Sequence, residues 1–231
     1  MDRAYSSTHN QPVANICAPR LMRLIWNDAY DPSSTQFGNI ENLRWLGTYP
    51  FRVYGKDDYA PNSYFLRLLQ CFEIIPNLKF RLIYLPPTDL HQGIPNHHND
   101  PLLCLHTNLH QDIANRQYLM EDITRLPHIA GMSLAITPQG HSIGASVFHV
   151  LRMSTGVRTL WLTLVGATSR PEACSSGCVC DQPSNWKTED LELNRLQQVE
   201  IHKLRGTEHE AALIKRLFDW ATMLKKMTVT F

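Results

Sequence analysis

The chain has 231 residues, 43% of them hydrophobic and 19% charged, and its 22 basic and 21 acidic side chains leave a formal charge of +1. This composition excludes a disordered tail, and a chain of this length can bury a substantial core. The near-zero charge argues against nucleic acid as the main partner, because contact with a phosphate backbone needs a basic surface.

The N-terminal segment, residues 1–15, is polar and lacks the apolar centre of a signal peptide or anchor. No later stretch has the roughly 18 consecutive apolar residues that span a membrane. The six cysteines include three, Cys17, Cys71 and Cys104, that lie far from one another in the sequence. Isolated thiols without an export signal indicate a reducing compartment, so we expect a cytoplasmic or nuclear protein.

One hydrophobic pattern recurs along the chain. Each copy has apolar residues spaced three and then two positions apart, followed by polar or turn residues. Residues two apart on a strand face the same side, so each copy predicts a short strand with one apolar face. The clear copies are Leu21-Leu24-Trp26, Ile129-Met132-Leu134, Val157-Leu160-Leu162, Leu196-Val199-Ile201 and Leu224-Met227-Val229, and weaker copies lie at Leu43-Leu46 and at Leu78-Phe80-Leu82.

Segments of helical period lie between these strands. A helix is expected from Asn62, a second over 146–154, and a third over 207–221, where Thr207 and Glu210 make a capping box. The apolar stripe expected on the third helix is Leu213, Ile214, Leu217, Phe218 and Ala221. Strands that alternate with helices indicate an α/β fold with a parallel sheet.

The repeated strands predict a leucine-rich-repeat solenoid with irregular repeats over 16–167. The steps from Met132 to Leu160 and from Val199 to Met227 are equal and lie at the upper end of the leucine-rich-repeat period. Two stretches interrupt the pattern: a proline- and histidine-rich insertion over 86–117, and a cysteine-containing linker loop over 168–190. Residues 191–231 then form a closing strand-helix-strand unit.

Residues 140–144 read Gly-His-Ser-Ile-Gly, which matches the nucleophile elbow of α/β-hydrolases. Asp181 or Asp190, followed by His202 or His209, would complete a triad in the right order. Pro138 and Gln139 separate the motif from its strand, and no oxyanion loop precedes it. We therefore interpret the motif as a loop that caps the next helix and keep a serine hydrolase that uses Ser142 as the alternative function.

Three cysteines, Cys174, Cys178 and Cys180, resemble part of a metal site. Their spacing is not that of a zinc ribbon, and no second close pair supplies a fourth ligand. Two histidine pairs, His97-His98 and His106/His110, are also candidate ligands. In zinc proteases a glutamate follows the first histidine, and both pairs lack it. We therefore expect no metal or cofactor and keep a zinc-stabilised module as a further alternative.

Side chains between the apolar strand positions point to the other face of the sheet. Trp161 alternates with Leu160 and Leu162, so we expect it on the open face, where an exposed tryptophan suits a binding hot spot. Packing beneath the neighbouring insertion is the other possibility. The predicted partner-binding residues on this face are Trp161, Thr163, Gln198, Glu200 and His202.

The C-terminal unit resembles the FBD domain of plant F-box/leucine-rich-repeat proteins. It has, in order, a strand around Val199, a Gly206-Thr207 turn with an acidic helix start, and a final strand after Leu224-Lys-Lys-Met. The segment from Cys178 to Glu189 is similar to the linker that precedes this domain in grass members. The resemblance implies the substrate-recognition part of a cullin-RING ubiquitin ligase.

In that family an F-box docks a Skp-type adaptor and the repeats present a target. No F-box precedes Leu21, so we expect a truncated product that binds the adaptor only where an F-box is supplied. The predicted function is therefore non-catalytic binding of a protein target, without nucleic acid or membrane as a partner.

Overall fold

The computed structural model describes residues 14–48, 50–55, 60–84, 116–166, 174, 178–182 and 184–231. Most of the polar N-terminal segment and of the predicted insertion lies outside the described residues, and so do four histidines considered as ligands, His97, His98, His106 and His110.

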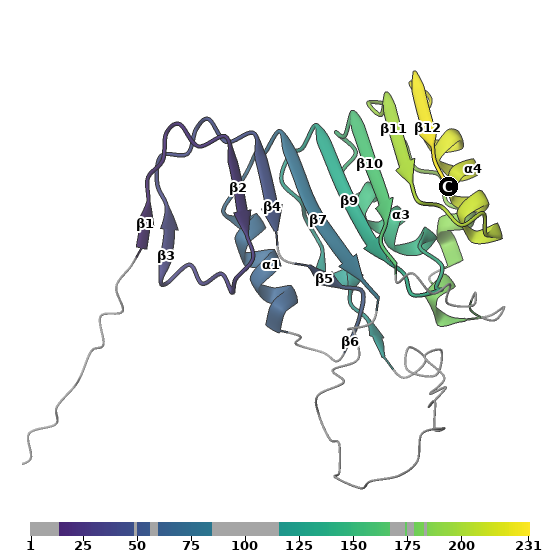
Figure 1. Cartoon of the computed structure of the whole chain (residues 1–231), viewed down its shortest axis with the longest axis horizontal. Helices are drawn as coiled ribbons and strands as arrows, with labels where there is room; N and C mark the ends of the chain where they lie inside the picture. Colours follow the sequence, from purple (N-terminus) through teal and green to yellow (C-terminus); the bar gives the residue numbers. More distant parts are fainter. Residues whose placement is uncertain are drawn as a thin grey trace, which may run out of the picture.

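One large sheet organises the described chain (Figure 1). Its strands are β2 (Arg23–Trp26), β4 (Trp45–Thr48), β5 (Phe51–Arg52), β7 (Asn77–Ile83), β9 (Gly131–Thr137), β10 (Thr159–Leu164), β11 (Gln198–His202) and β12 (Lys226–Val229). Their order is β12-β11-β10-β9-β7-β4-β2, with β5 also paired to β7, and every pairing is parallel. Neighbours in the sheet therefore follow one another along the chain.

The central residues of the repeated pattern pair directly across the sheet. Their row is Leu24, Leu46, Leu78, Met132, Leu160, Val199 and Met227. The five inner members of the row are completely buried. All seven copies of the pattern thus lie on strands, as predicted; the inward face is buried on the five inner strands and partly buried on the terminal strands β2 and β12. The fold is α/β with a mainly parallel sheet.

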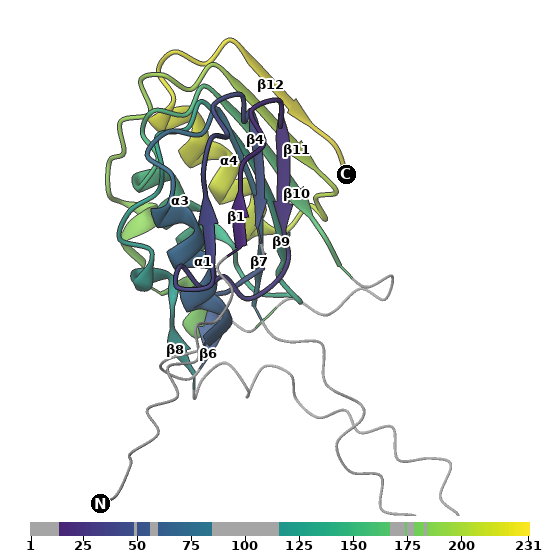
Figure 2. The ribbon, with the colours of Figure 1, turned by 90° about the vertical axis from the view of Figure 1, so that its left-hand side faces the viewer.

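Three helices lie on one face of this sheet (Figure 2). They are α1 (Ala60–Gln70), α3 (Gly144–Arg152) and α4 (Glu208–Trp220), and they confirm the three helices expected from the sequence. The core lies between helices and sheet.

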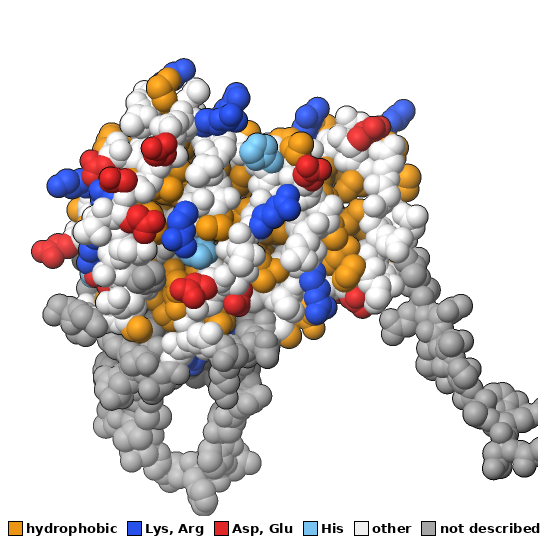
Figure 3. Space-filling view, turned by 180° about the vertical axis from the view of Figure 1, so that it is seen from behind, with side chains coloured by type: hydrophobic (Ala, Val, Ile, Leu, Met, Phe, Trp, Pro, Cys, Tyr) orange, Lys and Arg blue, Asp and Glu red, His pale blue; other side chains and the backbone are white. Residues whose placement is uncertain are grey.

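Figure 3 views the molecule from the side opposite to Figure 1, where acidic and basic side chains are interspersed on the surface.

The apolar stripe of α4 differs from the prediction at two positions: Phe218, expected in the stripe, is 56% exposed, and Trp220, not expected there, is buried. Leu213, Leu217 and Trp220 form the buried row. These three positions follow the i, i+4, i+7 spacing of a single helix face, which turns Phe218 to the margin. The predicted capping box is confirmed, because Glu210 N donates to Thr207 Oγ1 and Thr207 N donates to Glu210 Oε2.

Shorter elements flank the sheet. Two small pairs are β1 (Ala14–Ile16) with β3 (Thr35–Phe37), which are parallel, and β6 (Tyr54–Gly55) with β8 (Gln117–Tyr118), which are antiparallel. Single 3₁₀ turns are η1 (Met120–Asp122), η2 (Val179–Asp181) and η3 (Ser184–Lys187). Cys180 and Trp186 are buried, so these parts of the predicted linker loop pack into the core. Within the described ranges, every helix is too short or too polar to cross a bilayer.

Candidate functional site

The open face of the sheet carries the outward side chains of the parallel strands, away from the helices (Figure 2). The pairing places them in rows across the sheet. One row is Arg23, Trp45, Asn77, Gly131, Thr159, Gln198 and Lys226, and the next is Ile25, Gly47, Lys79, Ser133, Trp161, Glu200 and Thr228.

All five residues predicted to bind a partner lie on this open face and are half-buried. On β10 and β11, Trp161 pairs with Glu200, and Thr163 pairs with His202. Gln198 Nε2 donates to Glu200 Oε1 at 2.7 Å, and His202 Nε2 lies 3.7 Å from Glu200 Oε2. The structure thus groups the five residues, and their binding role stays a prediction.

Trp161 contacts a second tryptophan on this face that the sequence analysis missed. The ring centroids of Trp45 and Trp161 lie 5.9 Å apart, and the ring planes are tilted by 41°. Gly131 leaves room for them, because a Cβ there would lie 3.1 Å from the Trp161 ring. Trp45 directly precedes Leu46, so the same alternation that selected Trp161 could have identified it in the weaker copy of the pattern.

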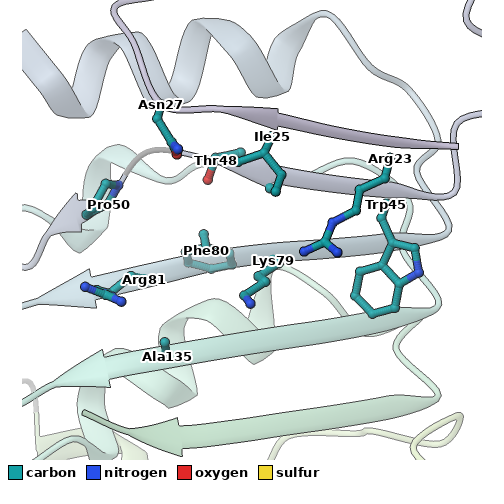
Figure 4. Close-up of a pocket in the computed structure, with 11 residues that line it drawn as sticks. Arg23, Ile25, Asn27, Trp45, Thr48, Pro50, Lys79, Phe80, Arg81 and Ala135 are labelled. Carbon is teal, nitrogen blue, oxygen red and sulfur yellow. The ribbon is translucent and has the colours of Figure 1, made fainter. Parts of the chain in front are cut away.

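A pocket of about 390 Å³ lies beside Trp45 on the open face (Figure 4). Trp45 stands at one end of the pocket, and Arg81 and Pro50 stand at the other. Ile25, which is 53% exposed, contributes apolar surface. The pocket therefore offers an aromatic and aliphatic wall on the same face as the predicted binding residues.

An irregular pairing of strands lies beside this pocket. Gly47 pairs with Lys79 and Phe51 pairs with Leu82, so four steps along β4 and β5 match three along β7. The extra residue is a β-bulge, which interrupts the ladder and shifts the alternation of side chains. Pro50 lies in the interrupted stretch, where a residue without an N–H loses no ladder hydrogen bond.

The pocket is electropositive. Three of its described lining residues, Arg23, Lys79 and Arg81, are basic and none is acidic. All three are exposed, and none forms an ion pair with an acidic side chain in the described part of the chain. Several positive charges around an apolar wall favour a ligand that combines negative charge with an apolar group.

Ser142 lies inside the protein. Its side chain is 1% exposed, and its Oγ has no hydrogen-bond partner among the described residues. None of the acid or histidine partners considered for a triad bonds to it. A buried serine without a base gives no support to the hydrolase alternative.

The three clustered cysteines meet a histidine. The Sγ atoms of Cys174, Cys178 and Cys180 and one ring nitrogen of His141 all lie within 4.8 Å of one another. The fourth possible donor is thus a single residue far upstream, in the Gly-His-Ser-Ile-Gly motif, and not a member of a second close pair of the kind considered from the sequence.

Comparison with protein-family models, with curated proteins and with solved structures finds no match to this chain. The resemblance to the FBD domain therefore rests on the sequence motifs alone, and a function must be argued from the geometry of the open face.

Proposed function

We propose that this chain is a non-catalytic protein-binding module whose open sheet face holds an acidic segment of a target protein. The observation that carries the proposal is the grouping of Arg23, Lys79 and Arg81 around an apolar pocket on that face. Carboxylates of the target pair with these cations, and an aromatic or aliphatic side chain lies against Trp45 and Ile25.

The proposed architecture of the module is a leucine-rich-repeat solenoid. The support for it is that strands repeat in chain order, are parallel, and pair in register through one recurring apolar pattern. In a solenoid each unit buries its apolar row against its neighbours, and the extended strand face is the binding surface.

The charges on the open face also favour one position for the bound segment. The pocket cations lie on β2 and β7, whereas Glu200 on β11 and Lys226 on β12 carry opposite charges at the far part of the face. An acidic stretch is therefore attracted to the first region, so charge complementarity fixes its position more than its affinity. Trp45 on β4 lies within the first region and Trp161 on β10 lies next to β11, and both suit a hot spot, a role that is frequent for tryptophan.

A peptide library displayed on phage tests this proposal with the full chain. We expect enriched peptides to carry Asp or Glu next to an aromatic or aliphatic residue. The double variant Lys79→Glu, Arg81→Glu should weaken binding of such a peptide by about tenfold or more, which is about 1.4 kcal/mol. Affinity should also fall with added salt, because exposed charges are screened.

Lys215→Glu is the matched control, because Lys215 is exposed on α4, on the other side of the sheet. It should leave the affinity unchanged. Enriched peptides without acidic residues, or equal losses in the pocket variant and in the control, would show that the pocket is not the binding site.

We further propose that the bound protein is a target for ubiquitination, which extends the FBD resemblance of 191–231. A characterised F-box fused ahead of the full chain should direct ubiquitination of a substrate that carries the selected peptide. If the peptide binds and the substrate stays unmodified, the ligase part of the proposal fails and the binding part stands.

A further inference from the structure

We propose that His141, Cys174, Cys178 and Cys180 form a structural zinc site. The site would fasten Cys174 and the turn η2 to the turn between β9 and α3. It lies on the helix side of the sheet, among residues that the proposed binding face does not use.

The distances between the donor atoms fit a single tetrahedral ion. Cys174 Sγ lies 3.4 Å from Cys180 Sγ, and Cys178 Sγ lies 3.5 Å from His141 Nδ1. Zinc bonds of about 2.3 Å to sulfur and about 2.0 Å to nitrogen place two sulfurs about 3.8 Å apart, and a sulfur and a nitrogen about 3.6 Å apart. Both of these pairs are close to these values, and the other donor separations are at most 4.8 Å, so small shifts of the side chains would complete a tetrahedron.

The donor set selects the metal. Three thiolates and one imidazole are a frequent structural zinc set, and soft sulfur ligands disfavour magnesium and calcium. All four positions of the tetrahedron are occupied by protein atoms, which leaves no place for a reactive water. The site is therefore structural and supplies no catalysis.

A disulfide is a poorer account of the same cluster. The Cys174 and Cys180 sulfurs lie 3.4 Å apart, whereas a disulfide bond is about 2.05 Å long. A disulfide would also use only two of the four clustered donors. One ion uses all four donors at once.

The local backbone brings the histidine to the cysteines. Gln139 and Gly140 have φ angles of 49° and 90°, so the chain turns sharply just before His141. Cys174 N donates to Gly140 O at 3.1 Å, which joins the two segments directly. The ring of Tyr84 stacks on the His141 ring, with the ring centroids 6.2 Å apart and the planes at 10° to each other. This contact orients the imidazole ring.

A backbone amide supports one of the thiolates. Ser142 N donates to Cys180 Sγ at 3.3 Å, the kind of second contact that orients a metal ligand. Gly144, two residues later, begins α3, so the positive end of this helix dipole lies near the cluster in sequence. Three thiolates and one Zn²⁺ carry a net negative charge, which both features stabilise.

The ligands that the ion would join belong to short described stretches. Cys178 and Cys180 lie in or beside the single turn η2, where Tyr54 Oη donates to Val179 O at 3.4 Å. Cys180 is 1% exposed and Cys174 is 8% exposed, so both reach the core. Metal bonds would tie these residues to the turn before α3.

The test is the zinc content of the full chain, purified under reducing conditions and measured by mass spectrometry of the metal. We expect about one zinc per chain. Cys178→Ser and His141→Gln should each lower the content at least about tenfold after dialysis. Cys71→Ser is the matched control, because Cys71 is an exposed free thiol outside the cluster, and it should keep the metal.

Measurements on the unaltered chain keep the proposal testable if the variants fail to fold. Added zinc should raise the thermal midpoint, a chelator should lower it, and cobalt(II) should give the visible spectrum of a tetrahedral thiolate complex. A folded, reduced chain that holds no zinc and gives no such spectrum would overturn the proposal. So would a Cys174–Cys180 disulfide in the folded chain. Neither result bears on the peptide-binding pocket.

Discussion

At the scale of single residues, Gly131 has a defined packing role. A Cβ at this position would lie 2.2 Å from Asn77 Oδ1 and 3.1 Å from the Trp161 ring. The Asn77 side chain in turn donates to Arg44 O at 3.0 Å. Glycine at position 131 is therefore compatible with two features at once: the contact between Trp45 and Trp161, and the hydrogen bond from Asn77 to Arg44.

Gly131→Ala should lower the free energy of unfolding by about 1–3 kcal/mol, because the added methyl group displaces Asn77 and crowds the tryptophan rings. Denaturant unfolding and tryptophan fluorescence measure the two effects. Gly156→Ala is the control, since its Cβ would meet nothing closer than 3.5 Å. An equal change in both variants would contradict the packing argument.

His149 makes folding sensitive to pH. Burial is the largest effect and lowers its pKa from the usual value; the hydrogen bond to the Ile123 carbonyl opposes it in part, and the charges of Arg152, which lowers the pKa, and Glu121, which raises it, have smaller effects. His149 Nε2 lies 3.0 Å from Ile123 O, so this nitrogen carries the proton in the neutral ring. The folded chain thus keeps His149 neutral at a pH where the unfolded chain binds a proton.

Stability should therefore fall as the pH drops below about 6.5, the ordinary pKa of histidine in an unfolded chain. His149→Gln keeps a donor for Ile123 and removes the titration. Unfolding free energies at about pH 7.5 and about pH 5.5 should differ less in the variant than in the unaltered chain. The same difference in both proteins would rule out His149 as the source.

At the scale of elements, the capping box of α4 can be tested directly. Thr207→Ala removes the acceptor for Glu210 N and should cost about 1 kcal/mol of stability. Hydrogen exchange should then be faster at the first amides of the helix. Thr207→Ser keeps the hydroxyl and should restore most of the loss. A loss that serine does not restore would point to the methyl group instead.

Regular elements could be predicted because each one repeats its own signal. The strands at Met132, Leu160 and Val199 alternate apolar and polar side chains, and the helix after Thr207 has both a cap and a stripe. The pairs β1-β3 and β6-β8 are two or three residues long, which is too short for a period to appear.

The candidate sites depend on contacts that no single segment contains. Alternation placed Trp161 on the open face, but the pocket beside Trp45 is lined by residues of several paired strands, which no single segment shows. His141 meets the cysteines only after β9, α3 and the linker are packed together. Spacing in sequence therefore could not show the fourth ligand.

At the scale of the whole molecule, the in-register apolar row makes stability depend on position along the sheet. Leu160 is completely buried between Met132 and Val199, whereas Leu24 is partly buried on a terminal strand of the sheet. Leu160→Ala should cost about 2–5 kcal/mol in denaturant unfolding, and Leu24→Ala should cost clearly less. Equal losses would mean that the row does not act as one core.

The two-residue alternation of the strands separates folding from recognition. Along β10, Leu160 and Leu162 maintain the interior while Trp161 and Thr163 meet the surroundings. If the open face binds as proposed, substitutions at the second set change its contacts at a smaller cost in stability than substitutions at the first set. New specificity can then arise through single substitutions that leave the apolar row in place.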